Sequence, residues 1–105
     1  MMVSAKLRGV YCPALTPFDE QLRPDASRFV EHCQSLLRQG WHGLAVFGTT
    51  GEANSLSVKE RIQLLEALLK AGIPPELIAP GTGCAALTDT ITLTRHAFQS
   101  GCAGA

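Results

Sequence analysis

The sequence has 105 residues, 46% hydrophobic and 17% charged, and its nine basic and nine acidic residues cancel to a formal net charge of zero. These values are typical of a single globular domain, residues 1–105, that can bury a modest core. The balanced charge excludes the basic surface expected of a nucleic-acid or anionic-membrane binder and leaves a small neutral or anionic ligand open. No run approaches the roughly 20 apolar residues of a membrane span, and Pro13 interrupts the stretch that could resemble a signal peptide.

The cysteines and histidines show no spacing that is typical of a metal site. The cysteines are Cys12, Cys33, Cys84 and Cys102. We expect small, buried thiols in a reducing compartment, and therefore a cytoplasmic protein. His32 and His96 fall within predicted helices and His42 at a turn, so structural roles are favoured for all three.

The first half of the chain predicts a strand, a helix and a second strand. Residues 9–18 mix β-branched, aromatic and small apolar residues and predict a short buried strand that ends at Pro17. Asp25 is a good N-cap, and an apolar stripe at helical spacing follows it until Gly40. The stripe consists of Phe29, Val30, Cys33, Leu36 and Leu37. Residues 44–47 form the second predicted strand.

A second helix and a third strand follow. Ser57 and Glu60 fit a capping box, which predicts a helix start at Ser57, and Gly72 with the two prolines behind it predicts the end. Residues 77–79 predict the third strand.

Residues 90–94 are ambiguous, because they alternate polar and apolar side chains as a half-buried strand does. A helix start at Thr88 and Asp89, apolar residues at helical spacing and a stop at Gly101 favour a helix.

A weak internal repeat predicts the architecture. Gly40, Gly72 and Gly101 each end a predicted helix, at intervals of 32 and 29 residues. A strand, a loop, a helix and a glycine stop thus recur as βα units, whose right-handed crossovers give an α/β fold with parallel strands. The chain is expected to end where a fourth strand begins.

The candidate binding loop is Gly48-Thr49-Thr50-Gly51-Glu52, which follows the second predicted strand. Its glycines allow sharp turns that point N–H groups outward toward a carboxylate or phosphate, and paired threonines suggest an anion clamp or a proton relay. A simpler interpretation is that the hydroxyls only cap the loop. Residues 81–86 match the dinucleotide pattern G-x-G-x-x-A, but the acidic residue expected about 20 positions later is missing.

These motifs resemble the dihydrodipicolinate synthase and N-acetylneuraminate lyase family of pyruvate-dependent aldolases. The resemblance runs through nearly the whole chain: residues 13–18, residues 48–52, Leu56-Ser57 with Glu60-Arg61, and residues 81–83. It implies a (β/α)8 barrel, usually a homotetramer, in which a lysine forms a Schiff base with pyruvate or another 2-oxo acid before an aldehyde is joined or released. It implies no cofactor.

The resemblance also implies roles for individual residues. Thr50 would hold the carboxylate of the 2-oxo acid through its hydroxyl and N–H, and Thr49 would belong to a tyrosine-linked proton relay. Gly51 and Ala14 would lie beside the bound acid, and Glu52 would brace the loop. Residues 81–83 would line the pocket, and Pro80 departs from the small residue expected there.

Length is the largest departure from the family. A barrel of this type takes about 250 residues, so this chain is expected to supply three βα units and the start of a fourth strand. The family lysine and tyrosine would then lie beyond Ala105, and Lys6, Lys59 and Lys70 are poorly placed to replace the lysine. The paired methionines suggest a natural start and the end within a strand suggests a truncation. Two alternatives are a non-catalytic unit that associates with itself or a partner, and a nucleotide-binding unit.

Overall fold

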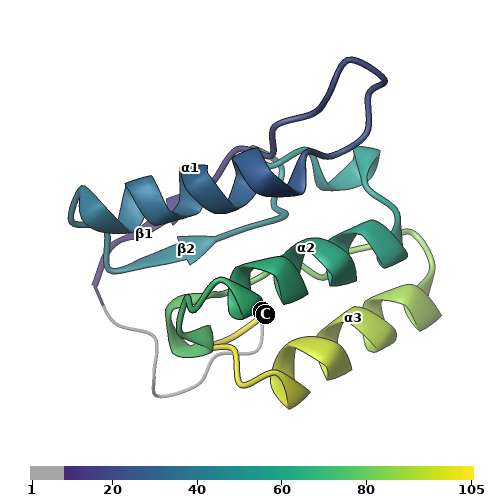
Figure 1. The fold of residues 1–105 in the computed structure, drawn as a ribbon. Coiled ribbons are helices and arrows are strands. Elements are labelled where there is room, and N and C mark those ends of the chain that lie inside the picture. The colour runs from purple at the N-terminus through teal and green to yellow at the C-terminus, as the bar shows by residue number, and fades with distance from the viewer. Residues whose placement is uncertain (1–8) are drawn as a thin grey trace.

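The computed structural model describes residues 9–105 and shows three parallel βα units (Figure 1). Strands β1 (Tyr11–Pro13) and β2 (Gly43–Ala45) pair in parallel, and Ile78 pairs in parallel with the other side of β2. The N–H of Ala103 donates to the carbonyl of Ile78 at 2.9 Å, so a fourth extended segment follows in chain order. Helices α1 (Ala26–Arg38), α2 (Val58–Lys70) and α3 (Leu87–Gln99) lie side by side over the strands.

The first two helices begin and end close to where the sequence predicts. The carboxylate of Asp25 accepts a hydrogen bond from the N–H of Arg28 at 3.1 Å and caps α1. Both halves of the capping box form in α2: Ser57 Oγ accepts from the Glu60 N–H at 3.0 Å, and Glu60 Oε1 accepts from the Ser57 N–H at 2.9 Å. Gly72 follows α2 with a φ of +94°, the left-handed conformation that favours glycine after a helix.

Residues 90–94 lie in the middle of α3, which confirms the helix prediction and shows that the strand alternative is wrong. The helix begins at Leu87, slightly before the predicted start, and its N-cap residue Ala86 provides no side-chain hydrogen bond. Burial of Leu93 and Ala97 shows which face of α3 packs inward. Helical spacing therefore outweighs the local alternation of polar and apolar residues.

The strands are shorter than predicted. The first spans residues 11–13 instead of continuing to Pro17, and the second spans residues 43–45 instead of 44–47, because Phe47 turns the backbone with a left-handed φ of 59°. The third is reduced to a single bridge at Ile78, since residues 75–77 form the short 3-10 helix η2 (Pro75–Leu77). Proline favours that turn because its ring holds φ near −65°.

The core lies between the strands and the helices. Its fully buried members come from all three units and include Ala14, Phe29, Cys33, Leu44, Leu68 and Ile78. The rings of Phe29 on α1 and Phe47 after β2 stack with centroids 5.6 Å apart. Burial raises the pKa of the Cys33 thiol from 9.0 to about 12, and nearby Cys12 adds to the increase. All four cysteines are free thiols.

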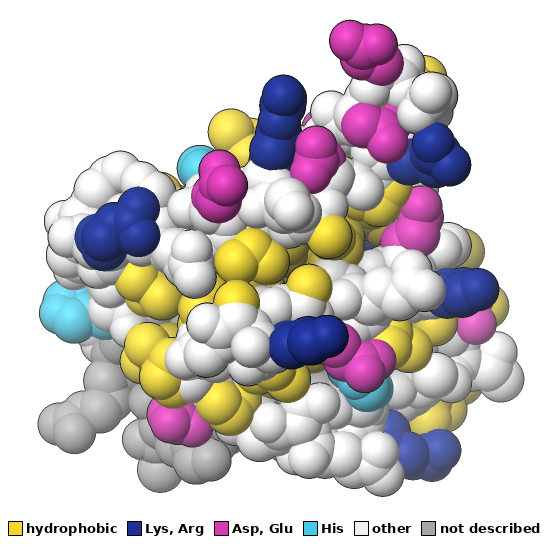
Figure 2. All heavy atoms as spheres, viewed as in Figure 1, with side chains coloured by type: hydrophobic (Ala, Val, Ile, Leu, Met, Phe, Trp, Pro, Cys, Tyr) yellow, Lys and Arg dark blue, Asp and Glu magenta, His cyan; other side chains and the backbone are white. Residues whose placement is uncertain are grey.

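The outer face of the helix layer carries scattered charges of both signs, with apolar side chains in the seams between helices (Figure 2). Across residues 9–105, none of the helices is long and apolar enough to span a membrane.

Candidate functional site

The candidate loop begins where β2 ends and folds back on itself. Phe47 anchors its start by stacking on Phe29, while the positive φ of Phe47 turns the backbone away from the strand. The N–H of Glu52 donates to the Thr49 carbonyl and the N–H of Ala53 donates to the Gly48 carbonyl, both at 3.1 Å. The chain then enters the short 3-10 helix η1 (Ala53–Ser55). Internal hydrogen bonds therefore define the shape of this loop.

Two glycines let the neighbouring loops pack against it. A Cβ on Gly51 would lie 2.9 Å from the Ala14 carbonyl and 3.1 Å from the Phe47 nitrogen. A Cβ on Gly81 would lie only 2.4 Å from the Phe47 carbonyl, and the Gly81 N–H donates to the Val46 carbonyl at 2.8 Å. The loops after all three extended segments thus meet at their carboxyl ends, which is where ligands bind in parallel βα folds.

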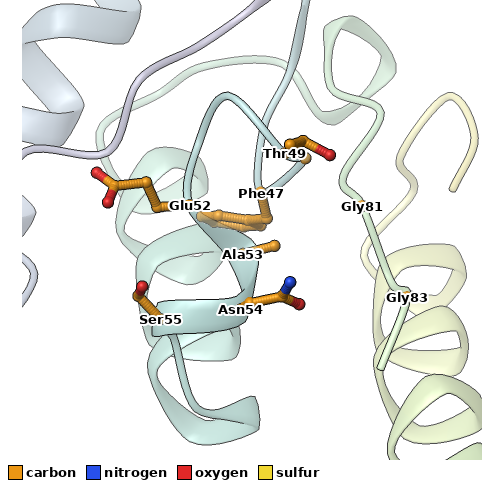
Figure 3. Close-up of a pocket in the computed structure, with 9 residues that line it drawn as sticks. Phe47, Thr49, Glu52, Ala53, Asn54, Ser55, Gly81 and Gly83 are labelled. Carbon is orange, nitrogen blue, oxygen red and sulfur yellow. The ribbon is translucent and has the colours of Figure 1, made fainter. Parts of the chain in front are cut away.

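A cavity of about 410 Å³ opens between the second and third loops (Figure 3). It is lined by Phe47, Gly48, Thr49, Glu52, Ala53, Asn54, Ser55, Gly81 and Gly83. In Figure 3 the side chain of Thr49 projects toward Gly81 and that of Asn54 toward Gly83, whereas the Glu52 carboxylate points to the opposite side. Hydroxyl and amide groups and backbone therefore dominate the walls that face the third loop.

The structure places the four predicted site residues in different surroundings. Thr49 lines the cavity, and Gly51 lies buried against the backbone of the fully buried Ala14. Thr50 is exposed and is not part of the cavity lining. Glu52 lines this cavity and also a second cavity of about 330 Å³ beside Thr16 and the start of α1. It therefore lies between the loop after β1 and the loop after β2.

Arg61 is a site residue whose role the sequence reasoning missed. Its side chain is buried, with 3% of the residue exposed, and its guanidinium donates to the Ala53 carbonyl at 2.7 Å and to the Gly83 carbonyl at 3.0 Å. A signal was available, because Arg61 precedes the buried Leu64, Leu65 and Leu68 at helical spacing. An arginine in a buried stripe indicates that polar partners lie nearby.

Helix α3 supports the third loop with two threonine side chains. Thr94 Oγ1 donates to Thr82 Oγ1 at 2.9 Å, and Thr90 Oγ1 accepts from the N–H of Cys84 at 3.1 Å. Two of the three threonines that gave residues 90–94 their strand-like alternation thus bind the loop that forms one wall of the cavity.

The part of the chain from residue 9 onward contains no group of three side chains suited to hold a metal ion. Neither His42 nor His96 lies at the cavity: His42 Nδ1 accepts from the Val10 N–H at 2.8 Å, and His96 lies 3.8 Å from the carboxylate of Glu66. The polar side chains that line the cavity are those of Thr49, Glu52, Asn54 and Ser55.

Comparison of the sequence with known proteins finds relatives that match most of this chain. An uncharacterized DapA-like lyase of Chloroflexus aurantiacus is 44% identical over 98 residues, which are 92% of this chain and 32% of that protein. The 4-hydroxy-tetrahydrodipicolinate synthase of Synechococcus sp. (strain CC9311) is 38% identical over 94 residues, covering 87% of this chain and 30% of that enzyme.

Comparison with solved structures agrees with the sequence comparison. Dihydrodipicolinate synthase from Agrobacterium tumefaciens superposes with a TM-score of 0.85 and 29% identity, over 90% of this chain and 33% of the enzyme. A pyruvate complex of a variant Sulfolobus solfataricus 2-keto-3-deoxygluconate aldolase gives a TM-score of 0.82 and 30% identity, over 92% of this chain and 32% of the aldolase.

The chain spans about a third of the length of these relatives, and its three units correspond to the first βα units of their TIM-barrel fold. The family model described as the dihydrodipicolinate synthetase family matches residues 6–105. On this evidence the chain belongs to the dihydrodipicolinate synthetase family of lyases and aldolases.

Proposed function

We propose that this chain is the N-terminal portion of a pyruvate-dependent aldolase and carries the part that binds the carboxylate of the 2-oxo acid. The observation that supports this most strongly is the position of Thr49 on the wall of a cavity at the carboxyl ends of the strands. A related aldolase of the same fold has been solved as a pyruvate complex.

In this proposal the two threonines have separate roles. Thr50 is exposed next to Thr49, and its hydroxyl and N–H are proposed to donate to a carboxylate that lies at the edge of the cavity that Thr49 lines. Thr49 passes a proton between the reacting groups, because a hydroxyl can accept and donate at once but hardly ionises near neutrality. Gly51 and Ala14 hold the floor of the loop, and Glu52 braces it from the opposite side.

The nucleophile of the reaction is proposed to be a lysine outside these 105 residues. Its amine would attack the carbonyl carbon of pyruvate, lose water and form the imine that then reacts with an aldehyde. Lys59 and Lys70 lie exposed on α2, whose apolar face turns toward the core, so neither reaches the cavity. The complete enzyme is proposed to be a cytoplasmic homo-oligomer that needs no cofactor.

The binding role can be tested with isotope-labelled protein and pyruvate. Titration is expected to shift the backbone amide signals of residues 49–51 in a saturable way. Thr50→Val should weaken binding about tenfold or more, because a hydrogen bond to a charged group contributes about 1.5–3 kcal/mol. Thr88→Val, on an exposed threonine at the start of α3, is the matched control and should bind pyruvate like the wild type.

Mass spectrometry after treatment with pyruvate and borohydride tests the proposed lack of a nucleophile. The mass is expected to stay unchanged, and a stable adduct on one specific lysine would refute that part of the proposal. Amide shifts that never saturate with pyruvate would refute the carboxylate-binding role. The same holds if Thr50→Val and Thr88→Val change the Kd of pyruvate equally.

A further inference from the structure

We infer that Arg61 is a positioning residue for the anion site: it joins the two walls of the cavity and places a buried positive charge behind them. This inference rests on the proposed function, since it concerns how the same site favours a carboxylate. It assigns a ligand-related role to a residue of α2 that does not itself line the cavity.

The hydrogen bonds of Arg61 connect two separate segments. One guanidinium nitrogen donates to the carbonyl of Ala53 in η1, and the other donates to the carbonyl of Gly83 in the third loop. Both acceptors belong to residues that line the cavity, on opposite walls (Figure 3). Among the side-chain hydrogen bonds of residues 9–105, those of Arg61 alone bridge these two walls.

The charge of Arg61 has no acidic partner in the part of the chain that the structure describes. None of the ion pairs between described residues includes it, and its Nε has no hydrogen-bond partner within this part of the chain. The adjacent carboxylate of Glu60 is occupied in the capping box, and that of Glu52 points away from the third loop. Within residues 9–105, the guanidinium is therefore compensated by carbonyl dipoles alone.

A buried, unpaired charge is costly, so a purely structural link would be made more cheaply by a neutral amide. The positive charge has a use if the cavity receives an anion, because water screens the charge of a buried guanidinium less than it screens a charge on the surface. The planar fork of arginine also explains the residue type: it can donate in two fixed directions at once, whereas the ammonium of lysine is a single point charge.

The test compares two ligands of similar shape and different charge. Pyruvate and its neutral methyl ester are titrated into wild-type protein, Arg61→Gln and Arg61→Lys, with backbone amide signals as the readout of affinity and of folding. Arg38→Gln is the matched control, because Arg38 is an exposed arginine in the last turn of α1 and its loss changes the net charge by the same amount.

Arg61→Gln is expected to raise the Kd of pyruvate about tenfold and that of the ester about twofold or less, since only pyruvate gains from the charge. Arg61→Lys should keep the preference for pyruvate, because it keeps the charge, but should speed amide hydrogen exchange in residues 82–84, since one wall loses its hydrogen bond. Arg38→Gln should change neither quantity.

An equal rise in the Kd of pyruvate and of its ester in Arg61→Gln would overturn the electrostatic role. Unchanged amide hydrogen exchange of residues 82–84 in Arg61→Lys would overturn the positioning role. If Arg61→Gln fails to fold, a lost preference for pyruvate in Arg61→Lys still refutes the electrostatic role. Wild-type protein that binds neither ligand would refute the proposed function itself. The positioning role would then be tested only by amide hydrogen exchange of residues 82–84 in Arg61→Lys.

Discussion

Substitution of Gly81 by alanine tests the close packing of the second and third loops. The added methyl would lie 2.4 Å from the Phe47 carbonyl oxygen, about 1 Å closer than an ordinary contact allows. The Cβ is fixed by the backbone of residue 81 and the oxygen belongs to the backbone of Phe47, so neither can swing away, the loops must separate, and the hydrogen bond from Gly81 to Val46 must lengthen from 2.8 Å. Overpacking of this kind costs about 1–3 kcal/mol, and we expect Gly81→Ala to lower the free energy of unfolding by that amount.

Gly83 provides a matched control two residues away in the same loop. A Cβ there meets no atom within 4 Å, and its φ lies outside the range that disfavours alanine. Gly83→Ala should therefore be neutral, or stabilising by up to about 1 kcal/mol through the lower entropy of the unfolded chain. Urea unfolding followed by circular dichroism measures both values. Equal midpoints for the two variants would refute the argument that these loops touch through Gly81.

Three further predictions concern stability and association. Ser57→Ala should lower the free energy of unfolding by about 1 kcal/mol in urea titrations, because the capping box is lost, whereas the exposed Ser27→Ala should not. Because burial raises the pKa of Cys33 from 9.0 to about 12, the folded chain keeps a proton that the unfolded chain releases; stability should fall above about pH 9 by roughly 1 kcal/mol per pH unit. Cys33→Ala should remove that slope, and an unchanged slope would contradict this cause. Val10 and Leu15 are 59% and 57% exposed, so sedimentation at micromolar concentration should show oligomers. A stable monomer would argue against association through these two exposed apolar side chains.

The helices could be predicted closely because their signals are local. Asp25 and the Ser57 capping box satisfy N–H groups within one turn of themselves, so the sequence contains both partners of each hydrogen bond. Strand lengths could not be predicted in this way. A strand residue needs a partner on another segment, and the left-handed turn at Phe47 and the 3-10 helix η2 remove those partners early.

Arg61 illustrates the same limit within the site. Helical spacing shows that it falls in the buried stripe of α2, but its acceptors, Ala53 and Gly83, come from two loops on either side of that helix in the sequence. Which carbonyls face the guanidinium depends on how the third loop is held, and Thr90 and Thr94 of α3 determine that.

The sequence by itself determined the order of the βα units, the ends of the first two helices and the loop that holds the candidate site, because periodicity, caps and glycine stops act over a few residues. Only the tertiary structure decided that Gly51 packs on Ala14, that Gly81 touches Phe47, and that Thr49 lines the cavity while Thr50 does not. Those contacts join segments distant in the sequence, and their geometry follows from the packing of parallel strands and helices as a whole.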